Sequence, residues 1–137
     1  MDKALNLLSL ARKAGRLELG EEPVGAAARA QHARLVVVAC DAGDHTWRRA
    51  LSFVANTQQL CVRVPYSKDD LGLSVGRSSL ALAAFTDPAL ALSFLKALPD
   101  APKYAKQMED LEKRTERIRQ RQKEEKAHRR NVRQGRK

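Results

Sequence analysis

The sequence offers few residues in patterns that could carry catalysis or hold a metal ion. His45 follows an apolar run that ends in Cys40, and Asp41 and Asp44 lie between the two. A histidine beside carboxylates could do acid–base work or bind a metal, but no second Cys/His cluster completes a zinc pattern. The sequence also lacks a Gly-x-Ser-x-Gly motif, a Gly-Lys-Ser/Thr phosphate loop and a Gly-x-Gly-x-x-Gly motif. We therefore predict that the protein is not an enzyme and holds neither a metal nor a cofactor.

Gly20, Glu21 and Glu22 form the one motif that fits ligand binding. An extended segment, Leu17 to Leu19, is predicted to end at Gly20, and a helix with Pro23 in its first turn to follow. Free amides at a helix start attract phosphates. A carboxylate there would repel phosphate but could accept hydrogen bonds from guanine or cytosine amino groups. The helix dipole alone would also explain the two acidic residues, so both interpretations stay open. A basic rim could surround the motif, formed by Arg12, Lys13, Arg16, Arg29 and Arg34.

Short apolar runs and amphipathic segments alternate along the first hundred residues and must position this motif. Strands are predicted at 17–19, 35–40, 60–64 and 80–85. Helices are predicted at 2–15, from residue 23, from 44 to about 54, at 67–76 and at 87–98. Asp44 is a candidate N-cap, and Cys40 and Cys61, at strand ends, are predicted to be small buried apolar groups. The alternation predicts an α/β fold with helices on both faces of the sheet.

Charge divides the chain into two parts. Its 137 residues include 26 Lys+Arg and 16 Asp+Glu, which gives a formal net charge of +10. Residues 103–137 hold 14 of the basic and 6 of the acidic residues, so residues 1–102 carry a net charge of only +2. Pro99 and Pro102 interrupt helix where the composition changes. We therefore predict an α/β domain over residues 1–99 and a basic helical tail over residues 100–137.

The tail carries a weak apolar seam in its first half only. Tyr104, Met108, Leu111 and Ile118 recur at spacings of 4, 3 and 7, and no seam follows. This pattern predicts a helix from about residue 101 to the mid-120s and a frayed basic end. Such an arm could neutralise phosphates on RNA, although a solvated helix without a partner is the alternative. The candidate phosphate contacts are Arg117, Arg121, Arg129 and Arg130.

Several classes of protein do not fit this sequence. No apolar run approaches the ~20 residues that a helix needs to span a bilayer. The N-terminus lacks the layout of a secretory signal, and two cysteines are too few for a disulfide framework. We therefore predict a cytoplasmic protein that does not contact a membrane.

Three stretches resemble the L-seven-Ae family of ribosomal, kink-turn RNA-binding proteins, and its bacterial members most closely. The stretches are LLSLARKAGRLELGEEPV at 7–24, ARLVVVACDAGDHT at 33–46 and YSKDDLGLSVGR at 66–77. The likeness runs over about residues 4–98 and leaves the tail outside. It implies a three-layer α/β/α sandwich with a mixed four-stranded sheet, here with a C-terminal basic helical extension. It also implies binding to kinked RNA that carries sheared G·A pairs.

The resemblance further implies which residues contact RNA. In the family, the start of the second helix enters the RNA groove with a Gly-x-Asn-Glu-x-x-Lys pattern. Gly20 fills the Gly position here, whereas Glu22, Pro23 and Ala26 stand at the Asn, Glu and Lys positions. Arg29, one turn on, could substitute for the lysine. The second contact element is the loop before the last strand, which corresponds to Val75, Gly76, Arg77, Ser78 and Ser79.

These observations lead to one function and one alternative. We predict a non-enzymatic RNA-binding protein whose partners are structured RNA, ribosomal RNA in particular, and the ribosome or an assembly intermediate. Arg77 could stack on a base or pair with a phosphate, and the tail would add phosphate contacts. The alternative is a protein-interaction module that has lost its RNA face, as Ala26 suggests, and docks a partner through the tail seam. No oligomer is required by either interpretation.

Overall fold

The computed structural model describes residues 2–133 of the chain, and their side chains through residue 130. The strands are β1 (Leu17–Leu19), β2 (Leu35–Val38), β3 (Leu60–Arg63) and β4 (Leu82–Phe85). The helices are α1 (Lys3–Lys13), α2 (Glu21–Arg29), α3 (Asp44–Val54), α4 (Lys68–Ser74), α5 (Pro88–Ala97) and α6 (Ala105–Arg133), with a 3-10 helix (Ala101–Tyr104) before α6. All strands and helices predicted for residues 1–99 are therefore present, with boundaries that differ by a few residues.

The four strands form one mixed sheet in the order β1-β4-β2-β3. β2 and β3 pair in parallel, whereas β4 runs antiparallel to both β1 and β2. At one end of the sheet Leu17 and Leu35 both pair with Phe85. At the other end the Gly20 amide donates a hydrogen bond to the Leu82 carbonyl at 3.1 Å. We call these the Phe85 end and the Gly20 end of the sheet.

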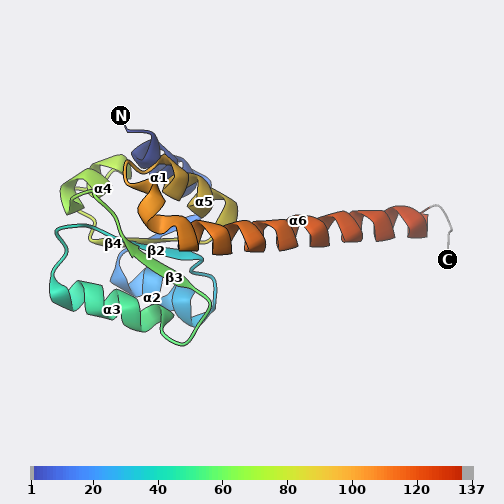
Figure 1. Cartoon of the computed structure of the whole chain (residues 1–137), viewed down its shortest axis with the longest axis horizontal. Coiled ribbons are helices and arrows are strands. Elements are labelled where there is room, and N and C mark those ends of the chain that lie inside the picture. Colours follow the sequence, from blue (N-terminus) through green and yellow to red (C-terminus); the bar gives the residue numbers. More distant parts are fainter. Residues whose placement is uncertain (1, 134–137) are drawn as a thin grey trace.

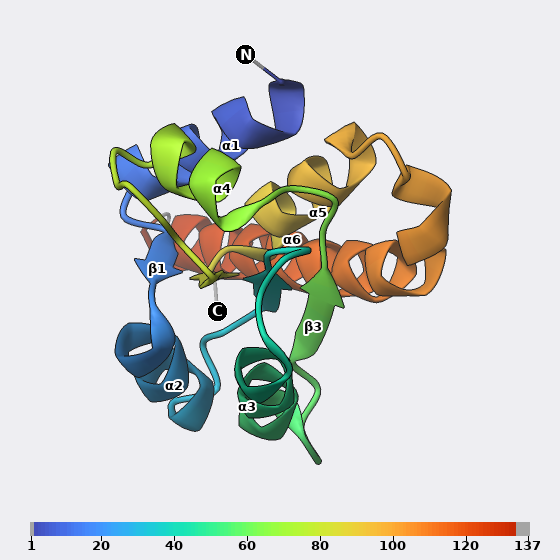
Figure 2. The same ribbon diagram turned by 90° about the vertical axis from the view of Figure 1, so that its left-hand side faces the viewer.

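Helices cover both faces of the sheet, as Figures 1 and 2 show: α1, α4, α5 and the start of α6 on one face, α2 and α3 on the other. Successive side chains of a strand point to opposite faces. Leu35 and Val37 accordingly join the core cluster beneath α1 and α5, while Val36 and Val38 join the one beneath α2 and α3. The three-layer sandwich with a mixed sheet is thus confirmed.

The helix starts follow from short polar side chains. Asp2 accepts a hydrogen bond from the Ala4 amide at 2.8 Å, and Ser67 accepts one from the Asp70 amide at 3.1 Å. Both are N-caps, as their residue types predict. The prediction for Asp44 is wrong, because Gly43 is the N-cap of α3 and Asp44 is the first helical residue.

The prediction that both cysteines are buried is wrong for Cys40. Its side chain is exposed because β2 ends at Val38 and the chain turns before α3 begins. Cys61 is half-buried on β3, and burial raises the pKa of its thiol to about 12. The Cys61 thiol is therefore protonated at neutral pH and a poor nucleophile.

The tail is helical over a longer stretch than the sequence predicts. α6 continues to Arg133 instead of fraying in the mid-120s. Residues 119–133 contain neither Gly nor Pro, and most of them are Arg, Lys, Gln, Glu or Ala, which favour helix. That preference outweighs the repulsion between like charges along the helix. No helix in the described part of the chain is both long and apolar enough to cross a membrane.

The seam anchors the start of α6 in the core of the domain. Tyr104 and Leu111 are 3% and 0% exposed and belong to the cluster beneath α1 and α5. Met108 packs against the same cluster, and Thr115, which the sequence analysis did not single out, is also buried. The Tyr104 hydroxyl lies 2.8 Å from the Arg63 carbonyl oxygen. The division of the chain at residues 99 and 100 stays a prediction, but its packed core extends into the tail.

Candidate nucleic-acid interface

The Gly20 bend joins the end of β1 to the start of α2. Gly20 has φ +93 and ψ 167, a combination that residues with a Cβ atom rarely adopt. It is the N-cap of α2, and nothing in the described part of the chain accepts a hydrogen bond from the amides of Glu21 and Glu22. Two N–H groups at the positive end of the helix dipole are therefore free to bind an anion.

The loop of residues 75–79 is held against α4 by a glycine. A Cβ atom on Gly72 would lie 2.7 Å from the Ser79 amide nitrogen and 2.9 Å from the Arg77 carbonyl oxygen. With no side chain in the way, the Arg77 amide donates to the Gly72 carbonyl at 2.8 Å. The Leu80 amide donates to the Lys68 carbonyl at 2.9 Å and fastens the far end of the loop. The loop is thus fixed by backbone contacts at both ends.

Two arginines connect the predicted contact elements. An Arg77 guanidinium nitrogen lies 4.0 Å from the position that a Cβ atom on Gly20 would occupy. An Arg12 guanidinium nitrogen, reaching from α1, lies 3.4 Å from the same position on Gly76. Both arginines are exposed, and neither forms an ion pair among the described side chains. The Gly20 bend and the loop therefore form one surface with two available cations, which we call the bend surface.

Glu21 is partly neutralised by a neighbour that the sequence did not indicate. Its carboxylate lies 2.7 Å from the Arg49 Nε on α3, and the Arg49 guanidinium stands 5.4 Å from the centre of the Phe53 ring. Glu21 and Arg49 are about half exposed, so the ion pair is weak and can open. Glu22 is exposed and unpaired among the described side chains. The pairing joins α2 to α3, and no spacing within either segment could have revealed it.

Two of the other predicted rim residues, Arg16 and Arg34, lie at the end of the sheet opposite to the Gly20 bend. The Arg16 carbonyl accepts a hydrogen bond from the Thr86 amide, and the Arg34 amide donates to the Phe85 carbonyl, so both residues are at the Phe85 end. The Arg34 Nε is buried without a hydrogen-bond partner among the described residues. Lys13 is exposed on the last turn of α1. Of the five rim candidates, the structure brings Arg12 against the predicted loop.

Arg29 closes the last turn of α2, at the far end of that helix from Gly20. One of its guanidinium nitrogens lies 3.4 Å from where a Cβ atom on Gly25 would be. Two Phe53 ring atoms lie 3.1 Å from the same point, which shows that Gly25 allows α2 to approach α3 closely. The Arg29 side chain therefore runs back along α2 toward Gly25.

Asp41 and His45, which could suggest acid–base catalysis or metal binding, do not form a site in the structure. The Asp41 carboxylate accepts a hydrogen bond from the Lys68 amide at 2.8 Å and so fixes the start of α4. His45 is exposed in the first turn of α3. Within the described part of the chain, no three His, Cys, Asp or Glu side chains are grouped so that they could hold a metal ion.

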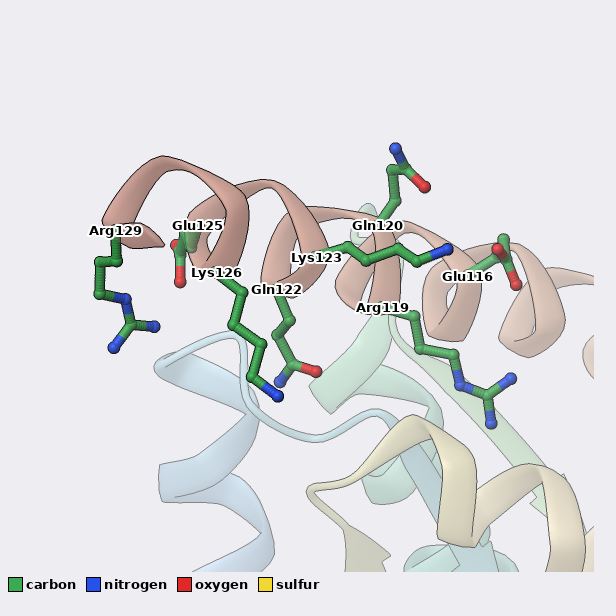
Figure 3. A pocket seen from close by; sticks show the side chains of 8 residues that line it. All are labelled: Glu116, Arg119, Gln120, Gln122, Lys123, Glu125, Lys126 and Arg129. Atoms are coloured by element: carbon green, nitrogen blue, oxygen red, sulfur yellow. The ribbon is translucent and has the colours of Figure 1, made fainter. Parts of the chain in front are cut away.

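The second part of α6 is a free helix, which we call the arm. Every residue from Arg119 to Arg130 is exposed. The four predicted phosphate contacts, Arg117 and Arg121, Arg129 and Arg130, are all exposed on α6. In Figure 3, Arg119, Lys126 and Arg129 extend from the same side of the arm. The predicted contacts do not include Arg119, Lys123 and Lys126, although the 3.6-residue period of a helix groups these three residues.

The seam assigned to partner docking is occupied by the domain itself. Tyr104 and Leu111 are buried against the cluster beneath α1 and α5, and Met108 packs beside them. These side chains cannot bind a partner protein while α6 is in place. The alternative interpretation therefore loses the surface on which it depended.

Two solved structures are similar to this chain. A protein of unknown function from Bacillus halodurans matches with a TM-score of 0.65 at 28% identity, over 71% of this chain and 97% of that one. The 15.5 kD RNA-binding protein of Giardia lamblia matches with a TM-score of 0.57 at 20% identity, over 72% of this chain and 84% of that one. No protein-family model matches the sequence, and neither does any curated protein. These likenesses establish the fold, while membership of the L-seven-Ae family stays a prediction.

Proposed function

We propose that the protein is a non-enzymatic RNA-binding protein of the L-seven-Ae type. The observation that carries the proposal is the meeting of Arg77 with the Gly20 bend, because it joins the two elements that the resemblance assigns to RNA contact. The bend surface offers free amides and unpaired guanidinium groups, which are groups that bind phosphate. The name of the Giardia lamblia protein, which shares the fold, describes it as RNA-binding.

Each group on the bend surface has a role in this proposal. The amides of Glu21 and Glu22 would bind a backbone phosphate at the start of α2. The free Glu22 carboxylate would accept hydrogen bonds from base amino groups, which a kinked RNA with sheared G·A pairs exposes. Arg77 would stack on an unpaired base or pair with a phosphate. The RNA that we propose is ribosomal RNA, in the ribosome or in an assembly intermediate.

The arm would strengthen binding without sequence preference. Its exposed cations contact phosphates, and each such contact releases counterions, so affinity falls as salt rises. The bend surface would then determine which RNA shape is bound, and the arm would add strength where the RNA extends beyond that shape.

Binding to matched hairpins tests this proposal. The probes are an RNA hairpin with a bulge beside tandem sheared G·A pairs and a fully paired hairpin of the same length. Replacing both Arg12 and Arg77 by Gln should weaken binding of the bulged hairpin by about tenfold or more, because hydrogen bonds to charged groups contribute about 1.5–3 kcal/mol each. The matched control replaces Arg48, exposed on α3, and Lys3 by Gln. Equal affinity of both double variants for the bulged hairpin would refute the proposed surface.

A further inference from the structure

The arm leaves the domain at the end opposite to the bend surface. Arg119 and Glu116 line a groove together with Ala89, which lies in the first turn of α5. Since α5 begins directly after β4, the arm departs from the Phe85 end. Figure 1 shows the same arrangement, with α4 and its following loop at one side of the domain and the free part of α6 projecting from the other. The two basic regions therefore do not adjoin.

Most of the arm's cations lie on one face. At 100° per residue, Arg119, Lys123, Lys126, Arg129 and Arg130 fall within about 120° of the helix circumference. Glu124 and Glu125 lie outside this sector, and Glu124 accepts a hydrogen bond from Gln120 at 3.4 Å. Among the described side chains, none of the five cations forms an ion pair. We call these five residues the basic face.

The basic face continues the side of α6 that is packed on the domain. Lys126 follows Met108, and Arg129 follows Leu111, by 18 residues, which is about five full helical turns. The same side of α6 thus carries apolar side chains where the helix packs on the domain and cationic side chains where it extends beyond the domain. The face is therefore turned toward the domain side at the Phe85 end, where Arg16 adds an exposed cation.

The basic face lacks the apolar stripe that a helix needs to bind a second helix or a lipid interface. No apolar seam follows Ile118, so a coiled coil with a second copy has no core. No apolar stripe could enter a lipid interface. Arg119 and Lys123, like Lys126 and Arg130, are like-charged neighbours at i and i+4, which destabilises the isolated helix. A polyanion along the face would remove that repulsion.

We propose that the basic face is a second RNA-binding site, which takes the backbone of an RNA segment different from the one on the bend surface. The strands separate the two ends of the domain by about 13 Å, and the arm reaches about 20 Å further from the Phe85 end. A short hairpin on the bend surface would therefore leave the basic face free for another segment. The protein then connects two RNA segments. This inference rests on the proposed RNA binding of the domain.

A recruitment assay with the full chain tests the inference. A plain RNA duplex is immobilised, and the labelled bulged hairpin is supplied in solution, so that only a protein with two sites retains the label. The arm variant replaces Arg119, Lys123, Lys126 and Arg130 by Gln. The control variant replaces Lys3, Lys103, Lys106 and Lys113 by Gln, which removes the same charge from exposed positions elsewhere.

We expect the wild type and the control variant to retain the hairpin on the duplex. The arm variant should retain at least about tenfold less, because four phosphate contacts are lost, while its own affinity for the hairpin in solution changes less than about threefold. Circular dichroism verifies that its helix content is unchanged. If hairpin affinity falls as much as retention, one RNA occupies both regions and the inference is wrong.

Two further outcomes separate the inference from the proposed function. If the wild type binds the hairpin in solution but retains none on the duplex, the second site does not bind RNA, and the inference is wrong while the proposed function stands. This result is also expected if the arm binds an acidic protein instead. If the wild type binds neither RNA, the proposed function itself fails.

Discussion

The bend surface and the arm present cations in opposite ways. On the bend surface, Arg12 and Arg77 lie against glycine backbone, and the loop of residues 75–79 is fastened to α4 by backbone hydrogen bonds. On the arm, every described side chain beyond Ile118 is exposed, and the helix itself determines the direction in which each points. A fixed arrangement of donors can select an RNA shape, whereas a line of exposed charges binds any phosphate backbone. Under the proposed function, the domain therefore selects the RNA, and the arm adds strength where a longer RNA reaches it.

The largest effect is expected where α6 packs on the domain, before the arm begins. Leu111 is fully buried between α6 and the domain, so Leu111→Ala should lower the free energy of unfolding by about 2–5 kcal/mol. Denaturant unfolding measures this, and Met108→Ala, at a half-buried position of the same seam, should cost less. Equally small losses of unfolding free energy in both variants would mean that the start of α6 is not part of the core.

The loop can be displaced without changing any charge. A Cβ atom at Gly72 would lie within 3 Å of the loop backbone, so Gly72→Ala should cost about 1–3 kcal/mol of stability and weaken binding of the bulged hairpin. Leu73→Ala, at an exposed position of the same helix, should leave stability nearly unchanged. Affinity for a plain RNA duplex should hardly change in Gly72→Ala, because the arm is intact. A full loss of duplex binding would contradict the division of roles.

Salt dependence separates the two regions further. Removing residues 119–137 keeps the buried part of α6 and should leave stability unchanged. For a long RNA in which the bulged motif adjoins a plain duplex, so that both regions bind, the slope of log affinity against log salt should fall by about 3, since each phosphate contact contributes about 0.7–0.9. Removing residues 103–137 would also delete the buried residues Tyr104 and Leu111. It would therefore destabilise the domain, and a loss of affinity could not be assigned to the arm. An unchanged slope in the shorter deletion would exclude the arm from RNA binding.

The smallest effect concerns the hydroxyl that fixes the start of α6. Tyr104→Phe removes a hydrogen bond to the Arg63 carbonyl and should cost about 1 kcal/mol near neutral pH. Burial, together with a hydrogen bond to Asp100, raises the pKa of Tyr104 above its ordinary value. Its contribution is therefore complete below pH ~10 and is lost as pH rises through the raised pKa. Denaturant unfolding of the wild type and of Tyr104→Phe should therefore show a difference in unfolding free energy that is smaller at alkaline than at neutral pH.

Local patterns were sufficient to predict the strands and helices of the domain. The β-branched run at Leu35 and the caps Asp2 and Ser67 act within a few residues of sequence, so they could be recognised without the fold. The alternation of strands and helices also predicted helices on both faces of the sheet. The mixed four-stranded sheet came from the resemblance, and the order of its strands was not predicted. The sequence predicts too early an end for α6, because a helix without an apolar seam gives no hydrophobic pattern, although the helix propensity of its residues sustains it.

The candidate site was less accessible to sequence reasoning because its contacts join distant segments. Arg49 on Glu21, Arg12 beside Gly76 and the close approach at Gly72 depend on how α1, α3 and α4 pack. The opposite placement of the arm follows from the antiparallel arrangement of α5 and α6, which composition cannot reveal. The resemblance alone indicated that the Gly20 bend and the loop of residues 75–79 act together as RNA-contact elements.

Mapping the protein–RNA contacts in the full chain tests the central claim most directly. The bulged hairpin is crosslinked to the protein by ultraviolet light, and the modified peptides are identified by mass spectrometry. Our account predicts crosslinks in residues 20–22 and in residues 75–79 on the same hairpin. Crosslinks confined to α3, with neither segment modified, would contradict it.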